Sequence, residues 1–268
     1  MKNDYVLGNQ PEEIERLKIQ ASFFEPMAKE VLMKAGIKKG MRCVDVGCGS
    51  GDVTRMMGSI VGKKGIVIGI DMNQKYIQYC TKVNKQSNVA FVCDDIIGTK
   101  LIKKEDFDII YSRFMFVHLK DKLSALKSMI RLAKKDGVIV IQETDHSPGS
   151  WLSYPKRESV EQLRKIYVRL IKKMGGDPLA GRKLYRMFVK ESMRTTVECY
   201  SPCLLMGHKP YSDLGWRLAE SLKPQIISFG LLSQTEYRKL LDELREMSND
   251  TESFATYARF FSVSGRKH

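Results

Sequence analysis

The sequence predicts an α/β fold in which a doubly wound, mostly parallel sheet carries an added helical cap. Three observations lead to this prediction. Between residues 36 and 145, short apolar strands alternate with amphipathic helices along the chain. This is the pattern of a parallel sheet that is covered on both faces. Charged or polar residues stand directly after these strands. The first strand runs into a turn with three glycines on alternate positions, and the turn leads into a helix.

The elements of this core are separated by clear helix caps and ends. Asn73 is suited to cap one helix, and Gly137 to end another that starts at Asp121. The expected strands are residues 42–46, 66–70, 89–93, 107–111 and 138–142, with helices at 53–61, 73–83 and 121–137. Ligands bind at the carboxyl ends of the strands in such sheets, so the residues that follow the strands are candidate site residues.

The segments that flank the core are expected to cover it. A helix over 11–24, an interruption at Pro26 and a second helix over 27–35 make residues 1–35 an N-terminal helical lid. After the core at 36–145, residues 146–253 form a helical cap. This cap contributes at least one late core strand, at 195–200, and its helices are expected at 160–174, 178–188, 213–223 and 233–248. Residues 254–268 supply the closing strand of the core sheet.

The composition indicates a protein with a large core and a basic surface. The chain has 268 residues, 43% of them hydrophobic, and a formal net charge of +14 that is spread along the chain rather than gathered in one basic tract. A lysine-rich solvated surface accounts for this charge. The alternative is a surface that attracts nucleic acid or an anionic substrate.

The first residues show no signal-peptide pattern, and no apolar stretch is long enough to cross a bilayer. We therefore expect a cytoplasmic protein without a membrane partner. Six cysteines without a C-x-x-C pair, and without histidines at ligand spacing, are expected to be structural thiols rather than metal ligands.

Two kinds of ligand compete for the glycine-rich turn over residues 44–52. A dinucleotide prefers Gly-x-Gly-x-x-Gly, but the third glycine of that pattern is replaced here by Asp52. A pyrophosphate beside Asp45 and Asp52 would also meet like charge. A sulfonium with an amino-acid tail can place its ammonium near these carboxylates and its own carboxylate at the helix N-terminus. Asp71 can accept both ribose hydroxyls of either ligand.

The stretch Asp45-Val46-Gly47-Cys48-Gly49-Ser50-Gly51 resembles motif I of the class I S-adenosylmethionine-dependent methyltransferases. The resemblance continues through residues 69–71, 91–96 and 107–113. It implies a Rossmann-like, seven-stranded sheet and S-adenosyl-L-methionine as the cofactor.

By this resemblance, Gly47, Gly49 and Gly51 cradle the methionine part, Asp71 binds the ribose, and Arg113 lines the methionine end. Asp95 binds the adenine amino group and Ile96 packs on the ring. Asp94 stands where many relatives have a small residue, so Asp94 and Asp95 could exchange roles. Asp45 and Met72 complete the candidate cofactor-binding residues of the core.

The ends of the chain resemble a branch of small-molecule methyltransferases. Tyr5-x-Leu7-Gly8, Glu15-Arg16-Leu17 and Gln20 are similar to the N-terminal lid of that branch, and residues 175–184 are similar to its cap. This implies that Tyr5 and Gln20 close over the cofactor and that the methyl acceptor is a small molecule.

The predicted function is methyl transfer from S-adenosylmethionine to a small-molecule acceptor by in-line displacement. This reaction needs positioning and, for some nucleophiles, a base. Candidate bases are His118, Glu143 and His146, with His208 harder to place; His118 can also be interpreted as a packed structural histidine. The alternatives are an RNA- or protein-directed methyltransferase that uses the basic surface, or a non-catalytic cofactor-binding partner.

Overall fold

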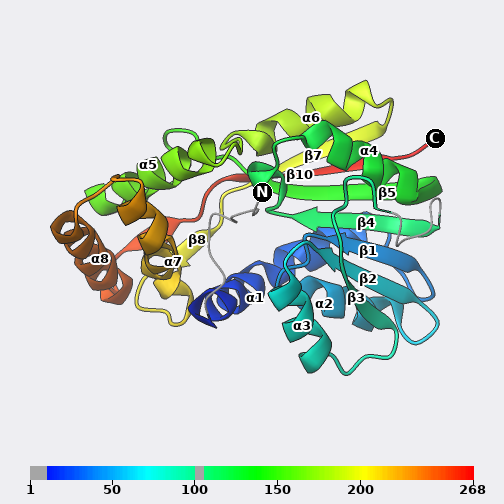
Figure 1. Cartoon of the computed structure of the whole chain (residues 1–268), viewed down its shortest axis with the longest axis horizontal. Helices are drawn as coiled ribbons and strands as arrows, with labels where there is room; N and C mark the ends of the chain where they lie inside the picture. The colour runs from blue at the N-terminus through cyan, green and yellow to red at the C-terminus, as the bar shows by residue number, and fades with distance from the viewer. Residues whose placement is uncertain (1–10, 100–105) are drawn as a thin grey trace.

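A seven-stranded sheet forms the core of one part of the molecule, as the sequence predicts, and the cap lies beside it (Figure 1). The computed structural model describes residues 11–99 and 106–268. The strand order is β3-β2-β1-β4-β5-β10-β7, and only β10 runs antiparallel to its neighbours in this sheet. The strands are β1 (Arg42–Val46), β2 (Ile66–Asp71), β3 (Val89–Cys93), β4 (Phe107–Arg113), β5 (Ala133–Thr144), β7 (Arg194–Tyr200) and β10 (Phe260–Arg266).

Helices bury both faces of this sheet. Successive residues of a strand point to opposite sides, so neighbouring apolar residues pack against helices on different faces. Val44 and Ile110 pack in one apolar layer with α4 (Lys122–Leu132) and α6 (Ala180–Lys190). Their neighbours Cys43 and Ile109 pack in another layer with α1 (Pro11–Lys34) and α2 (Asp52–Val61). The unbroken apolar strands of the sequence are explained by this two-sided burial.

Helix α1 runs without a break through Pro26, so the interruption predicted there is wrong. Phe24, Ala28, Val31 and Leu32 recur at helical spacing on the face that the rest of the protein buries. Proline removes one hydrogen bond of the helix. Burial of this apolar face on both sides of Pro26 outweighs that loss and keeps the helix continuous.

The predicted helix from Asp121 to Gly137 is also shorter than expected. Helix α4 ends at Leu132, and β5 already begins at Ala133, which pairs with Phe107 of β4. A shift in register follows between Phe107 and Ile109. The pairing of the extended chain with β4 takes precedence over the helical tendency of residues 133–136.

The predicted closing strand divides into two strands that belong to different sheets. β9 (Phe254–Thr256) lies between β6 (Ser153–Tyr154) and β8 (Cys203–Leu205) in a small antiparallel sheet, whereas β10 joins the core. The two faces of the small sheet differ sharply. Leu204 and Ala255 are buried on one face, while Tyr154 and Leu205 on the other are 67% and 56% exposed.

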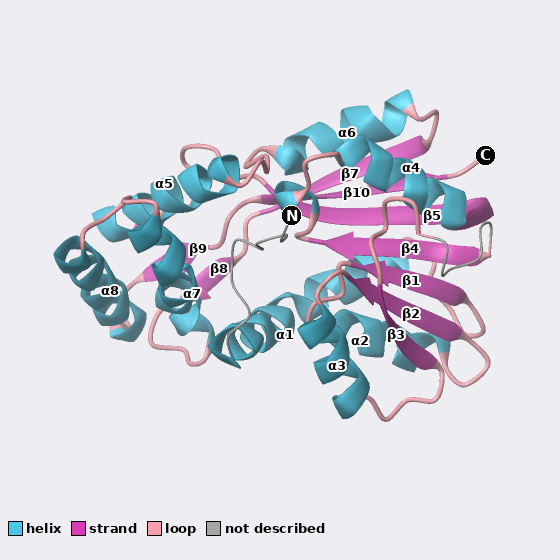
Figure 2. Cartoon of the chain, viewed as in Figure 1, coloured by secondary structure: helices cyan, strands magenta, loops and turns pink. Residues whose placement is uncertain are grey.

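The cap is therefore a helical layer on a small sheet rather than helices alone (Figure 2). Its helices are α5 (Glu158–Lys173), α7 (Leu214–Ser228) and α8 (Gln234–Asn249). Helix α6 instead covers the core sheet, where Phe188 packs against the bare backbone of Gly265. The remaining elements are α3 (Gln74–Val83) and the short helices η1 (Phe116–His118) and η2 (Tyr211–Asp213). None of the described helices has the length and apolar character of a membrane span.

We predict that the capping box of α8 contributes measurably to stability. Ser233 Oγ accepts from the amide of Glu236, whose carboxylate accepts from the amide of Ser233. The Ser233→Ala substitution should lower the free energy of unfolding by about 1 kcal/mol, measured by urea denaturation. Ser228→Ala, at an exposed position at the end of α7, serves as the control and should change it by less than about 0.5 kcal/mol. Equal effects of the two substitutions would contradict the capping role.

Candidate functional site

The glycine-rich turn after β1 is held in a left-handed conformation that glycine adopts easily. Gly47, Gly49 and Gly51 have φ angles of 72°, 51° and 75°. The amides of Gly47 and Cys48 both donate to the carbonyl of Ile70, at 2.8 and 3.0 Å, which ties the turn to the end of β2. The next residues enter α2, so the turn lies at a helix N-terminus.

The three glycines differ in which atoms lie where a side chain would begin. A Cβ on Gly47 would lie 2.8 Å from Sδ of Met115, and one on Gly51 would lie 2.8 Å from the ring of Phe91. Among the described residues, a Cβ on Gly49 would meet only Leu17 of α1, at 4.0 Å. Gly47 and Gly51 are thus required by packing, and Gly49 leaves an open cradle under α1.

Asp71, at the end of β2, links the turn to the next helix. Its Oδ2 accepts from the amide of Gly49 and its Oδ1 from the amide of Asn73, both at 2.9 Å. Burial raises the pKa of Asp71 above its usual value. A carboxylate offers about four acceptor positions, so two remain that the described residues do not use. Met72, the next residue, is 48% exposed.

Asp45 and Arg113 form the charged part of the site. Asp45 on β1 is buried, accepts from Thr54 Oγ1 at 2.6 Å, and burial raises its pKa to about 6. The guanidinium of Arg113 lies 5.9 Å from the ring centre of Phe24 and 5.8 Å from that of Phe114. Its Nη1 is buried and forms no hydrogen bond within the described part of the protein. A partly buried cation with such a donor can bind the carboxylate of a ligand.

The loop after β3 separates the roles of its two aspartates. Both oxygens of Asp94 are engaged, one by the amide of Asp95 and the other by the hydroxyl of Thr99. Asp95 accepts the amide of Ile97 on Oδ1 at 2.8 Å. Its other oxygen takes no hydrogen bond from any described residue. Ile96 is buried in the apolar layer beneath the loop.

Helix α1 lies over this turn and carries a buried polar row. Arg16 forms a bidentate ion pair with Glu13, although the two side chains are only 3% and 1% exposed. Arg16 also donates to Gln20 at 2.8 Å, and Gln20 donates to the hydroxyl of Tyr257 at 2.9 Å. The lid helix is thereby joined to the chain that leads into β10. Tyr5, the other predicted lid residue, lies outside the described residues.

Of the candidate bases, Glu143 at the end of β5 is buried and fully engaged by the protein. One carboxylate oxygen accepts the amide of Val117 at 2.9 Å, and the other accepts the amide and hydroxyl of Thr144. Burial nevertheless raises its pKa to about 7. Burial also lowers the pKa of His118 to about 4. Glu143 therefore holds η1, the turn that carries His118, against the strand. His208 is exposed in the cap.

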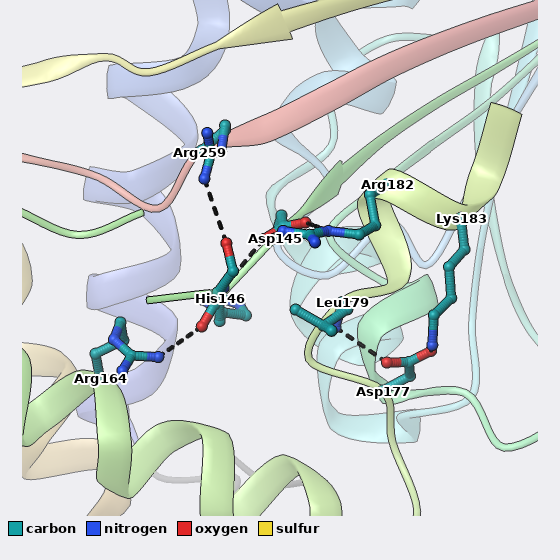
Figure 3. A network of polar contacts seen from close by, with 9 residues as sticks. Asp145, His146, Arg164, Asp177, Leu179, Arg182, Lys183 and Arg259 are labelled. Carbon is teal, nitrogen blue, oxygen red and sulfur yellow. Dashed lines mark hydrogen bonds and ion pairs between the residues drawn. The ribbon is translucent and has the colours of Figure 1, made fainter. Parts of the chain in front are cut away.

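His146 lies where β5 leaves the sheet, within a network of backbone and side-chain contacts (Figure 3). Its carbonyl accepts from Arg164 of α5 at 2.7 Å, and the preceding Asp145 pairs with Arg182 of α6. Ser147 accepts from Arg259, just before β10. The imidazole Nδ1 accepts from the indole Nε1 of Trp151 at 3.1 Å. The strand end is thus bound to both cap and core.

An apolar cavity of about 60 Å³ lies in the cap beside these residues. Trp151, Leu163, Leu204, Met247, Ala255 and Tyr257 contribute to its walls. The ring of Tyr257 also stacks on Phe114 at 6.1 Å and meets Phe24 at 4.7 Å. Tyr257 therefore lies between this cavity and Arg113, at the carboxyl edge of the sheet.

The structure brings most of the residues predicted from the sequence to one edge of the sheet. The turn glycines, Asp45, Asp71 and Arg113 lie together there. Sequence reasoning missed Tyr257 and the Arg16–Glu13 pair. The signal for the pair was present, because Glu13, Arg16 and Gln20 interrupt the apolar face of α1 at helical spacing. No group of three or more potential metal ligands occurs among residues 11–99 and 106–268.

A glycine-rich turn after β1 and an acid at the end of β2, on a sheet of this order, define a class I S-adenosylmethionine-dependent methyltransferase. A family model described as a methyltransferase domain matches residues 37–191. The chain therefore belongs to this methyltransferase family, and S-adenosylmethionine is its cofactor. The residues fit this cofactor, since Asp71 keeps free acceptor positions, Gly49 leaves an open cradle and Arg113 keeps a buried donor.

A curated relative agrees with the family, and two solved structures agree with the fold. The chain is 30% identical over 156 residues to a demethylmenaquinone methyltransferase of Staphylococcus aureus, which covers 58% of this chain and 61% of the relative. It thus matches less than two thirds of the relative's length. The YcgJ protein of Bacillus subtilis has a TM-score of 0.60 at 15% identity and covers 90% and 97% of the two chains. Phosphoethanolamine N-methyltransferase 2 of Haemonchus contortus was solved with S-adenosylhomocysteine. It has a TM-score of 0.57 at 18% identity, and the match covers 90% of this chain and 52% of that chain.

We predict that Asp71→Asn weakens the binding of S-adenosylmethionine. Loss of a charged acceptor should cost about 1–3 kcal/mol, or roughly tenfold to a hundredfold in affinity, measured by titration calorimetry. Asp108→Asn is a matched control, because Asp108 also accepts a backbone amide, that of Arg42, but near the opposite end of the sheet. The control should leave the affinity unchanged. An unchanged affinity in Asp71→Asn would refute the assignment of this residue to the cofactor.

The glycine turn allows a second comparison, between Gly51→Ala and Gly62→Ala. Both glycines have positive φ, at 75° and 65°, so both substitutions strain the backbone. Within the described part of the chain, the new Cβ at position 51 meets atoms closer than 3.0 Å, whereas one at position 62 meets nothing within 4 Å. Gly51→Ala should therefore lose more unfolding free energy and more cofactor affinity than Gly62→Ala. Equal losses in thermal denaturation and calorimetry would show that strain alone governs the turn.

The raised pKa of Glu143 predicts a pH-dependent stability. Its pKa in the folded protein, about 7, lies above the ordinary value of 4.5, so the protonated carboxyl is favoured by folding. The contribution of Glu143 to the free energy of unfolding is fully present below pH 4.5, and it is lost as the pH rises towards 7. Glu143→Gln should flatten the fall in unfolding free energy over this range in urea denaturation. Glu25→Gln, at an exposed position of α1, should keep the slope of the unmodified protein.

Proposed function

We propose that the protein transfers the methyl group of S-adenosylmethionine to a small-molecule acceptor held between the core and the cap. One observation supports this proposal most directly: Tyr257 contacts the lid helix, the residues beside Arg113 and the cap cavity at the same time. An acceptor in contact with Tyr257 would be enclosed by α1 on one side and by the cap on the other. Such an enclosed space suits a small molecule better than a folded RNA or protein.

In this proposal the cofactor supplies an electrophilic methyl group on a sulfonium. Gly47, Gly49 and Gly51 cradle its methionine part, Arg113 binds its carboxylate and Asp45 lies near its ammonium. Asp71, with Met72 beside it, accepts the ribose hydroxyls. Asp95 keeps one oxygen that no described residue engages, whereas both oxygens of Asp94 are engaged, and this supports Asp95 rather than Asp94 as the partner of the adenine amino group.

The protein then contributes position and exclusion of water rather than covalent chemistry. Alignment of the acceptor with the methyl group is worth roughly 7–11 kcal/mol of barrier when the geometry is good. Gln20 and Arg16 keep α1 in place over the site through Tyr257. Glu143 fixes η1. The similar proteins are named as methyltransferases of demethylmenaquinone and of phosphoethanolamine, and these names support a small acceptor.

The proposal is tested by incubating the protein with S-adenosylmethionine that carries a labelled methyl group. One sample receives a metabolite and lipid extract, a second total RNA and a third a protein extract, and Asp71→Asn is the control in each. We expect the label in the first sample only, in a product of low molecular mass. Label in RNA or protein would instead support the alternative of a macromolecular substrate. Calorimetry without any binding of S-adenosylmethionine or S-adenosylhomocysteine at millimolar concentration would refute the proposal.

A further inference from the structure

Strand β7 lies at one end of the core sheet, and its outer edge is unpaired in the described part of the chain (Figure 1). On its inner side, β7 pairs with β10 over all seven residues from Arg194 to Tyr200, without a shift of register. Alternate residues of an antiparallel strand direct their backbone N–H and C=O groups away from that neighbour. The outer edge of β7 therefore presents a row of backbone donors and acceptors that no described strand uses.

The features by which proteins usually protect such an edge are missing from β7. Edge strands are commonly kept short, interrupted by proline or a bulge, charged with lysine, or covered by another segment. β7 has seven residues, contains neither proline nor lysine, and five of the seven are exposed. The strand at the opposite end of the sheet, β3, has five residues, of which one is exposed. The edge of β7 is thus the more open of the two.

The two faces of β7 carry different side chains. Val197 pairs with Val263 of β10, which belongs to the apolar layer beneath α6, so Val197 points to the face that α6 covers. The neighbouring Thr196 and Glu198 point to the other face, because side chains alternate along a strand. On that face Glu198 pairs with Lys34 of α1 at 2.7 Å. The strand therefore has an apolar side and a charged side.

Helix α6 extends the apolar surface next to this edge. Tyr185 and Val189 are 47% and 48% exposed, and Val197 of β7 is 45% exposed. A helix turns by about 100° per residue, so Tyr185 and Val189 lie on one flank of α6 and Lys183 on the opposite flank. Lys183 pairs with Asp177, whose amide donates to η1, and η1 follows β4 in the middle of the sheet. The flank with Tyr185 and Val189 is thus turned towards the β7 edge.

The charges of β7 make this edge complementary to itself. Arg194 and Glu198 are four residues apart and so lie on one face of the strand, with Thr196 midway between them. If two β7 strands pair antiparallel about a two-fold axis at Thr196, Arg194 of each copy lies opposite Glu198 of the other. Opposite charges in facing positions of two strands stabilise the pair, whereas like charges destabilise it. On the α6 face the same register places Thr195 opposite Val197.

We propose that the β7 edge is an interface with a second copy of this chain, in which the two β7 strands pair antiparallel about Thr196 and join the two core sheets. The two-fold axis is normal to the sheet, so α6 of both copies lies on the same face. The flanks with Tyr185 and Val189 then meet across the axis. A second copy is the partner because the charges of the strand fit the strand itself in this register. The interface lies outside the cofactor site and does not depend on the proposed function.

Sedimentation velocity of the full chain tests the interface. The unmodified protein should have twice the mass of one chain at micromolar concentration. Arg194→Glu places like charges opposite each other at two positions of the interface, and it should weaken the dimer about tenfold or more. Arg194→Glu combined with Glu198→Arg restores opposite charges and should recover most of this loss. Arg238→Glu, at an exposed position of α8, changes the net charge equally and should leave the dimer unchanged.

Binding of S-adenosylhomocysteine, measured by calorimetry, shows that each variant is folded, and its affinity should be the same in all of them. A protein that remains a monomer at about 100 μM, a hundredfold above a micromolar Kd, would overturn the inference. A dimer that Arg194→Glu and Arg238→Glu affect equally would also overturn it.

Disulfide cross-linking locates the two-fold axis. The two copies of Thr196 face each other, with Cα atoms about 4.5–5.5 Å apart, which is within the reach of a disulfide. Thr196→Cys, with Cys199 and Cys203 replaced by serine, should therefore give a covalent dimer on mild oxidation. The matched control keeps the exposed Cys199 of the same strand and carries only Cys203→Ser. Its two thiols lie six residues apart along the paired strands, roughly 20 Å, and should not cross-link. Cross-linking of the control, or of neither protein, would overturn the proposed pairing.

Discussion

The arrangement of the whole molecule depends on the burial of α1 against two partners at once. Its second half packs into the apolar layer under the core sheet through Ala28, Val31 and Leu32. Its first half contacts the cap through Ile19 and Phe23. Between these halves, Phe24 meets Phe114, Tyr257 and Phe260, so that core and cap converge on one aromatic cluster. A single helix thus carries all three sets of contacts and joins the cap to the core.

The core could be predicted because its local signals and its long-range packing agree. Apolar strands, helix caps and strand-end acids all pointed to a parallel sheet, and the structure has that sheet. The elements that were predicted wrongly are those in which a long-range contact overrides the local pattern. Pro26 is retained inside a helix because both flanks are buried, and residues 133–136 are drawn into β5 by β4.

The cofactor residues could be predicted because they occupy one short motif and the ends of successive strands. The residues of the proposed acceptor site could not, because they come from distant segments that no periodicity relates. Tyr257 precedes β10, Leu204 lies in β8 and Met247 lies in α8, and only the folded cap brings them together. The role of His146 illustrates the difference. Its residue type suggested a base, whereas the donor on Trp151 determines which of its nitrogens carries the proton.

The small sheet of the cap is a single layer between the cavity and solvent, and this has a consequence for how the family could diversify. Leu204 and Ala255 face the cavity side, while Leu205 and Tyr154 lie on the exposed side. A shift of one residue in strand register exchanges the two faces of a strand. Insertion or deletion of one residue in the loop before β9 would therefore change the chemical lining of the cavity without altering any residue that binds the cofactor. Acceptor choice and cofactor use can evolve separately in this architecture.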